Sequence, residues 1–237
     1  MPRPVRDEVR PASRFSRQIS VRAVDYAWAY RLRLARLGKR PDPATLRHED
    51  ARLRPILLLP GVYETWHFLE AAGRHLHALG HPVHVVPTFG SNVRPIAEMA
   101  QLASDYLIER DLTNVALVAH SKGGLIGKTL MISDVGEARV GSLVAINSPF
   151  SGSDYAHLVP LRTLREFVPT HDTILGLARS AEVNSRITSI FSVWDPIIPN
   201  GSMLDGATNI ELPVTGHFRI LDRPELLDAV TRAVTDL

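Results

Sequence analysis

Cysteine is absent from this chain of 237 residues. Without a thiol there can be no disulfide scaffold, no thiolate zinc site, no iron–sulfur cluster and no cysteine nucleophile. The cellular compartment stays open on this point, because proteins without disulfides occur on both sides of membranes.

Long apolar runs are also missing. No window reaches the roughly 18 uninterrupted apolar residues that a membrane-spanning helix needs. Near the N-terminus, Arg22, Asp25 and Arg31 interrupt the one apolar stretch, so no secretory signal peptide is expected. We therefore expect a protein that does not span a membrane and that is located in the cytoplasm.

The composition is that of a globular chain, with 45% apolar and 22% charged residues. The net charge of +2 is divided unevenly. Residues 1–54 carry 14 basic and 6 acidic side chains, and residues 55–237 carry 13 basic and 19 acidic ones. A basic arm of this kind can bind nucleic acid, anionic lipid or the acidic body of its own chain. No recognition motif accompanies the arm, so we expect no nucleic-acid partner.

Apolar residues recur at helical spacing in the N-terminal arm, which predicts a helix over residues 19–37 that ends at Gly38. Their stripe consists of Ile19, Ala23, Tyr26, Tyr30, Leu34 and Leu37. Trp28 and Leu32 lie opposite the stripe, which suggests contacts on two sides. This pattern favours a helix docked on the body. A basic helix on a membrane surface is the alternative, so peripheral membrane contact through the N-terminal helix stays open. The polar, proline-containing residues 41–54 predict a linker.

After Pro55, short β-branched runs alternate with helical patterns. We predict strands at 56–59, 82–87, 115–119, 140–146, 187–193 and 210–212, and helices at 68–79, 96–109, 125–132 and 222–234. Repeated strand–helix–strand units predict an α/β fold with a central, mostly parallel sheet flanked by helices. We expect an N-terminal helical extension over residues 1–54 and a domain over residues 55–237.

Residues 150–186 break the alternation of strands and helices. Two short helical faces there predict a small helical cap over a site. The apolar residues of these faces are Leu158, Leu161, Leu164, Val168, Ile174, Leu175 and Leu177. Five of them, Leu158, Leu161, Val168, Ile174 and Leu177, suggest an apolar pocket.

A serine stands between a predicted strand and a predicted helix, in Ala119-His120-Ser121-Lys122-Gly123-Gly124. On such a sharp turn the hydroxyl is lifted clear of the backbone, and the next amide points to where an oxyanion would form. Small residues are needed two places before and two places after the serine, because the strand and the helix approach closely. Ala119 and Gly123 meet this need, although the strict pattern has glycine at both places.

This hexapeptide resembles the nucleophile elbow of the α/β-hydrolases, in particular of small bacterial lipases and esterases, one subgroup of which carries alanine at the place of Ala119. The resemblance covers about residues 55–237 and implies a triad in the chain order Ser, Asp, His. The sequence supplies Ser121, then Asp195 after the strand at 187–193, and His217 after the strand at 210–212. Residues 147–153 resemble the segment that leads from strand to cap in bacterial lipases.

The resemblance also implies an oxyanion hole built from two backbone amides. By position these are the amides of Val62 and Lys122, with Ala119, His120 and Gly123 forming the elbow. Pro60-Gly61 stands where such families usually have His-Gly, and this exchange leaves the amide of Val62 intact.

The implied function is hydrolysis of a carboxylic ester, either a small molecule or a lipid, without a metal or organic cofactor. A thioesterase, an amidase or an acyltransferase could use the same triad, and a non-catalytic binding or surface-docked protein of hydrolase ancestry is a further alternative. The oligomeric state stays open.

Three residue-level alternatives remain. Asp205 is the rival to Asp195 as the acid of the triad. The side chain of Lys122 is expected to point toward solvent, or else to lie beside the nucleophile and favour an anionic substrate. A metal site among the histidines is not expected, because His75 and His77 are two apart on a helix and cannot face one ligand together.

Overall fold

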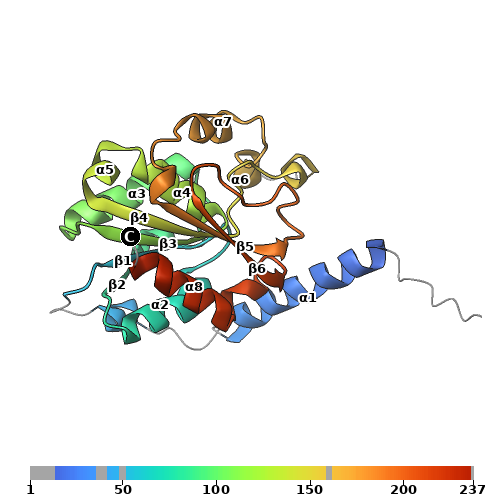
Figure 1. Cartoon of the computed structure of the whole chain (residues 1–237), viewed down its shortest axis with the longest axis horizontal. Coiled ribbons are helices and arrows are strands. Elements are labelled where there is room, and N and C mark those ends of the chain that lie inside the picture. Colours follow the sequence, from blue (N-terminus) through green and yellow to red (C-terminus); the bar gives the residue numbers. More distant parts are fainter. Residues whose placement is uncertain (1–13, 36–41, 48–51, 159–161, 236–237) are drawn as a thin grey trace, which may run out of the picture.

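The fold is built on a parallel sheet of six strands in the order β2-β1-β3-β4-β5-β6. This computed structural model describes residues 14–35, 42–47, 52–158 and 162–235 (Figure 1), so the predicted helix end at Gly38, together with Leu37 and Leu161, lies outside the described residues. The strands are β1 Ile56–Leu59, β2 Val83–Val85, β3 Val115–His120, β4 Val140–Ile146, β5 Ile187–Trp194 and β6 Thr208–Thr215. Every described pair of neighbouring strands is parallel. The predicted fold class is confirmed.

The predicted strands all appear, but β2 covers only Val83–Val85 of the predicted 82–87, and β6 is much longer than predicted. The last strand was expected over residues 210–212 only, whereas β6 extends from Thr208 to Thr215. Its polar ends pair with β5, as in the register of Thr208 with Thr188. Strand β6 lies at the edge of the sheet and is mostly open to solvent, so it can contain polar residues. A search for apolar runs therefore detects only part of it.

Helices pack on both faces of the sheet. They are α2 Glu70–Ala78, α3 Ile96–Glu109, α4 Lys122–Met131, α5 Asp134–Arg139 and α8 Pro224–Thr235. The prediction of α3 is confirmed to the residue, while α4 begins three residues earlier than predicted, at Lys122. The six-residue α5 was not predicted, although Ser133 caps its first turn by accepting a hydrogen bond from the Gly136 amide at 3.2 Å.

Alternate residues of the central strands separate two apolar cores. In β1, Leu57 and Leu59 join the core formed with α3 and α4, and Ile56 and Leu58 join the core formed with α2 and α8. Figure 1 shows α3, α4 and α5 on one side of the sheet and α2 and α8 on the other. Side chains of a strand alternate between faces, so these fully buried strands are apolar at every position except His120 at the end of β3.

The segment that follows β4 contains short helices, as expected of residues 150–186. They are η4 Asp154–Leu158, α6 Arg162–Arg165 and α7 Asp172–Arg179. Ile174 and Leu177 of α7 are buried in the core beside α4, and Val168 packs against the same core. These three residues therefore hold the segment on the body.

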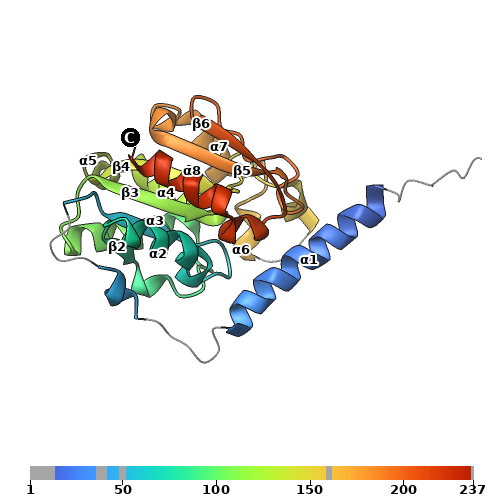
Figure 2. The ribbon, with the colours of Figure 1, turned by 60° about the horizontal axis from the view of Figure 1, so that its bottom comes forward.

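Helix α1, Arg14–Ala35, lies outside both helical layers, at the end of the sheet toward which the strands point (Figures 1 and 2). Its Trp28 donates a hydrogen bond from Nε1 to Asp222 Oδ2 at 2.9 Å. Ala29 and Leu32 pack against the core that contains α2 and α8. The helix is therefore docked on the body, on the side that carries Trp28 and Leu32.

The predicted apolar stripe is not the side of α1 that is buried on the body. Of the predicted stripe, Tyr26, Tyr30 and Leu34 are all more than half exposed. Asp25, by contrast, is fully buried on the docked side. The docked side is set by polar partners of Asp25 and Trp28, which a search for apolar spacing does not detect. Among the described residues, no helix combines the length and the apolar character needed to cross a bilayer.

Candidate active site

The candidate site lies where two neighbouring strands end. The chain passes from β1 outward to β2 and then returns to β3, which pairs with β1 on its other side. Ligands of open α/β sheets bind outside the carboxyl ends of the strands at such a reversal. Here Leu59 pairs with Ala119, so the loop after β1 and the turn after β3 are adjacent.

Ser121 occupies a strained turn between β3 and α4. Its backbone has φ 53° and ψ −119°, a region that residues other than glycine rarely adopt. The Ser121 amide donates to the carbonyl of Ile146 at 2.9 Å, which fixes the turn to β4. A Cβ on Gly123 would lie 1.9 Å from the Leu59 carbonyl oxygen. This close approach of the Leu59 backbone explains why a residue without a side chain is needed two places after the serine. Two places before the serine, Ala119 is fully buried within β3.

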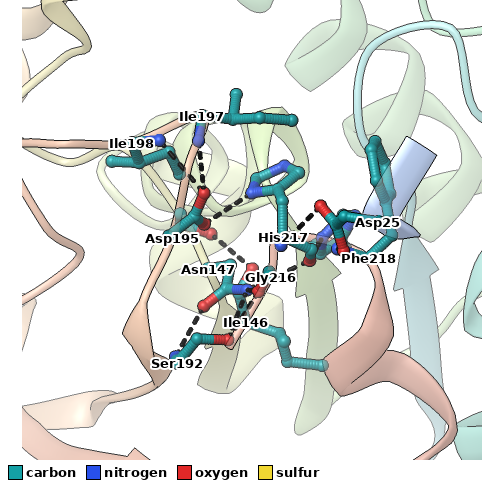
Figure 3. Close-up of polar contacts among 12 residues, drawn as sticks. Asp25, Ile146, Asn147, Ser192, Asp195, Ile197, Ile198, Gly216, His217 and Phe218 are labelled. Atoms are coloured by element: carbon teal, nitrogen blue, oxygen red, sulfur yellow. Dashed lines mark hydrogen bonds and ion pairs between the residues drawn. The ribbon is translucent and has the colours of Figure 1, made fainter. Parts of the chain in front are cut away.

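His217 and Asp195 form a direct hydrogen bond, with Nδ1 of His217 2.6 Å from Oδ2 of Asp195 (Figure 3). The second carboxylate oxygen, Oδ1, accepts from the amides of Ile197 at 2.8 Å and Ile198 at 3.1 Å. These bonds orient the carboxylate, and the carboxylate in turn orients the imidazole. Asp205, the rival acid, is exposed, so the structure brings Asp195 and not Asp205 to His217.

The environment stabilises the charged form of each partner. Burial raises the pKa of Asp195, but the charge and hydrogen bond of His217 and the two backbone amides outweigh it and lower the pKa below the ordinary value. Burial lowers the pKa of His217, but Asp195, followed by Glu64 and Asp25, raises it above the ordinary value of 6.5. The pair is therefore suited to carry a proton on the imidazole.

Ser121 and His217 line one cavity of about 690 Å³, together with Val62. This volume falls within the range of about 300–1,000 Å³ that is typical of small-molecule sites. Most of the lining is apolar or aromatic and includes Ala29, Phe68, Leu164, Phe167, Ile197, Ile198 and Phe218. Of the cap residues expected to make the pocket apolar, Val168, Ile174 and Leu177 pack on the body instead, and Leu161 and the side chain of Leu158 lie outside what the structure describes.

The backbone amides expected to form the oxyanion hole come from the two adjacent segments. Lys122 is the first residue of α4, and the first amides of a helix have no partner within the helix. Val62 lies in the loop after β1 and lines the cavity with Ser121.

The side chain of His120 joins three loops of the site. Its Nδ1 lies 2.8 Å from Glu64 Oε1, and its Nε2 lies 3.1 Å from the carbonyl oxygen of His217. Glu64 Oε2 accepts from the Gly61 amide at 2.7 Å. A carbonyl oxygen only accepts, so His120 Nε2 is the donor in its contact with the His217 carbonyl. Glu64 and His120 thereby connect the loop after β1, the elbow and the segment that carries His217.

Both expectations for the side chain of Lys122 are wrong. The residue is fully buried, and Nζ donates to the carbonyl oxygens of Asn92, at 3.1 Å, and Arg94. Asn92 in turn donates from Nδ2 to the Pro60 carbonyl at 2.7 Å. Burial lowers the pKa of Lys122 to about 8, although Glu166 opposes this shift. The lysine therefore holds the segment of Asn92 and Arg94, and Asn92 in turn bonds to Pro60 in the loop after β1.

Sequence reasoning missed the residues that hold the segment around His217. Asn147 donates from Nδ2 to the carbonyls of Gly216 at 3.2 Å and His217 at 3.0 Å, and Ser192 Oγ donates to the Gly216 carbonyl at 2.7 Å. Asp25 accepts from backbone amides of the same segment. The sequence signal that could have revealed Asp25 is its spacing. Asp25 begins a second helical stripe that continues with Trp28, Ala29 and Leu32.

Several of the remaining histidines have structural contacts. His75 Nε2 lies 3.0 Å from Thr231 Oγ1, and His84 Nδ1 lies 3.2 Å from the hydroxyl of Tyr106. Burial, followed by Arg47 and Arg110, lowers the pKa of His84 to about 4. In the part of the chain that the structure describes, no three histidine or carboxylate side chains are grouped so that they could hold a metal ion.

Comparison with known proteins identifies the fold. No protein-family model matches the chain, and no curated protein matches its sequence. Three similar solved structures are a Bacillus licheniformis lipase in its propeptide form, Aspergillus fumigatus lipase B and a structure from work on carboxylesterases of the thaumarchaeon Nitrososphaera gargenis.

The similarity lies in the structure rather than in the amino-acid sequence. The Bacillus lipase has a TM-score of 0.62 and 13% sequence identity, and the match covers 83% of this chain. The Aspergillus lipase has a TM-score of 0.64 and 17% identity, and the archaeal protein has a TM-score of 0.57 and 14% identity. Each of these two matches covers 80% of this chain. The chain spans about half of each lipase, 52% and 55% of their lengths, and 94% of the archaeal protein. This chain has the α/β-hydrolase fold.

Proposed function

We propose that this protein is a serine hydrolase that cleaves carboxylic esters, with Ser121 as nucleophile, His217 as general base and acid, and Asp195 as the carboxylate that orients His217. The observation that carries the proposal is the 2.6 Å contact between His217 Nδ1 and Asp195 Oδ2 at the wall of the cavity that Ser121 also lines. Similarity in fold to lipases and esterases supports it.

The proposed reaction follows from these positions. Ser121 Oγ attacks the ester carbonyl carbon while Nε2 of His217 removes the hydroxyl proton, and Asp195 stabilises the resulting imidazolium. Backbone amides of Val62 and Lys122 stabilise the tetrahedral oxyanion, and one such donor is typically worth about 3 kcal/mol. His217 then returns the proton to the leaving alkoxide. Water attacks the acyl-enzyme with His217 as base, and the carboxylic acid leaves.

An apolar acyl chain is the substrate feature that the cavity favours. Phe68, Phe167 and Ile197 are among its lining residues. Each methylene group removed from water contributes about 0.8 kcal/mol, which corresponds to roughly a fourfold gain in binding. We therefore expect kcat/KM for p-nitrophenyl esters to rise with acyl length until the cavity is filled.

The decisive experiment is labelling with a fluorophosphonate, followed by mass spectrometry of the modified peptide. We expect the label on Ser121, and we expect Ser121→Ala to lose the label together with hydrolysis of p-nitrophenyl esters. Loss of the nucleophile from such a triad costs about 10⁶-fold in kcat. A graded panel of esters, thioesters and amides identifies the bond that is cleaved fastest.

Turnover by Ser121→Ala at the rate of the wild type would refute the proposed role of this serine. An unlabelled wild-type protein that also fails to cleave every ester would favour a binding protein of hydrolase ancestry. Circular dichroism of the variant checks that the fold is retained.

A further inference from the structure

Asp25 of helix α1 makes a set of contacts that docking alone does not require. Its carboxylate accepts three backbone hydrogen bonds, from the amides of His217 at 2.8 Å, Phe218 at 2.9 Å and Arg219 at 3.1 Å. The bond to His217 joins residues 192 positions apart in the chain. Figure 3 shows Asp25 beside the segment that carries His217, on the side away from Asp195.

Burial makes this carboxylate costly unless it is well satisfied. Asp25 has no exposed surface, and an ionised carboxylate in that setting needs strong donors to offset its lost hydration. Three converging amides supply such donors, and hydrogen bonds to a charged acceptor are about twice as strong as neutral ones. The carboxylate is therefore fixed to this segment of backbone in particular.

The fit between Asp25 and the segment is close. A Cβ on Gly216 would lie 2.5 Å from Asp25 Oδ1, and Gly216 has φ +115°. A residue with a side chain would therefore strain the backbone at this position and also push the carboxylate away.

The two sides of the His217 segment are held by different parts of the chain. Its carbonyl oxygens accept from Asn147, Ser192 and His120, which belong to the body. Its amides donate to Asp25, which belongs to the N-terminal helix. The direction in which the imidazole of His217 points depends on both sets of bonds, because they orient the peptide groups on either side of its Cα.

We propose that Asp25 is a positioning residue of the active site, which holds the backbone of His217 through three amide hydrogen bonds and makes helix α1 a working part of the hydrolase. This inference rests on the proposed function for its kinetic consequence. Helix α1 also contributes Arg22, Tyr26, Ala29 and Tyr30 to the cavity that Ser121 lines, which places the same helix at the substrate.

The charge of Asp25 adds a measurable effect to its geometry. Four groups face the imidazole of His217: Asp195 after β5, Glu64 in the loop after β1, His120 at the end of β3, and Asp25 on α1. The three carboxylates raise the pKa of His217. Removal of one of them therefore lowers this pKa. The acidic limb of the pH–activity profile, where activity falls as His217 becomes protonated, then shifts to lower pH.

The test compares Asp25→Asn with Trp28→Phe. Trp28→Phe keeps an aromatic ring on the docked side of α1 and removes only the bond to Asp222, so it controls for weaker docking. We expect Asp25→Asn to lower kcat by about 10- to 100-fold, as expected for a misplaced catalytic group, with little change in KM. We also expect its acidic limb to move to lower pH. Trp28→Phe should change neither kcat nor the position of the limb.

Two outcomes overturn the inference. One is an Asp25→Asn enzyme whose kcat and pH profile match those of Trp28→Phe, since Asp25 would then serve docking only. The other is fast hydrogen exchange of the His217, Phe218 and Arg219 amides in the wild-type protein, where we expect slow exchange. The exchange measurement needs no variant and no substrate. It therefore tests the hold of Asp25 on the segment even if the wild type cleaves no ester, a result that would refute the proposed function alone.

Discussion

At the scale of single residues, Gly123 determines how closely the elbow can approach the first sheet strand. The carbonyl oxygens of Leu59 and Pro60 would lie 1.9 Å and 3.0 Å from a Cβ at this position. Both are backbone atoms of the segment that also carries Val62. Any adjustment to a larger residue therefore moves the elbow away from the loop after β1.

We predict that Gly123→Ala lowers the free energy of unfolding by more than about 3 kcal/mol, because overlap with fixed backbone is among the most destabilising changes. Urea denaturation followed by circular dichroism measures this loss. The matched control is Gly176→Ala in α7, where a Cβ would meet no atom within 4 Å. Helix propensity alone then favours alanine by up to about 1 kcal/mol. Equal effects of the two substitutions would contradict the steric argument.

The raised pKa of His217 gives a second prediction at this scale. The imidazole acts as a base only when neutral, so kcat/KM should fall as pH drops through the pKa of His217. Since this pKa lies above the ordinary value of 6.5, we expect the midpoint of the acidic limb above pH 6.5. A pH profile of ester hydrolysis measures it.

Asp195→Asn is the matched variant for this profile. It removes the main group that raises the pKa, so the midpoint should move to lower pH, and the loss of imidazole orientation should lower kcat by about 10⁴-fold. A wild-type midpoint at or below 6.5 would be inconsistent with the stabilisation of the imidazolium described above.

At the scale of elements, helix α1 is attached by a small number of specific contacts. Asp25 and Trp28 are bonded to residues between His217 and Asp222, while Ala29 and Leu32 add apolar contact. The hydrogen bonds of α1 to the body are therefore made by an acid and an indole. Arg22 lies over the ring of Tyr155, 4.6 Å from its centroid, so this basic residue contacts an aromatic ring and not an acidic side chain.

We predict that deletion of residues 1–40 lowers the melting temperature and the rate of ester hydrolysis together. For a domain of this size, each kcal/mol lost lowers Tm by about 2–4 °C. Differential scanning calorimetry and a p-nitrophenyl ester assay measure the two effects. Deletion of residues 1–13 is the control, because it leaves all of α1 in place. An unchanged Tm after the longer deletion would favour the alternative of a helix on a membrane surface, which otherwise stays a prediction.

At the scale of the whole molecule, the candidate site combines five segments that are distant in sequence. They are the loop after β1, the elbow after β3, the segments after β5 and β6, and helix α1. Four of them meet because parallel strands place their carboxyl ends at one edge of the sheet. Helix α1 joins them from outside the sheet.

The sequence by itself determined the alternation of strands and helices and the candidates Ser121, Asp195 and His217. Buried parallel strands are short and apolar, and an elbow needs small residues around its serine, so both features are local and visible in the chain. The edge strand β6 was detected only in part, because solvent exposure allows polar residues along it.

Tertiary structure alone decided which side of α1 faces the body, where the side chain of Lys122 lies and which groups hold His217. Each of these depends on polar partners far away in sequence: the amides that satisfy Asp25, the carbonyl oxygens that accept from Lys122, and the carbonyls held by Asn147. A buried polar group must find partners wherever the fold brings them, and apolar periodicity carries no information about those partners.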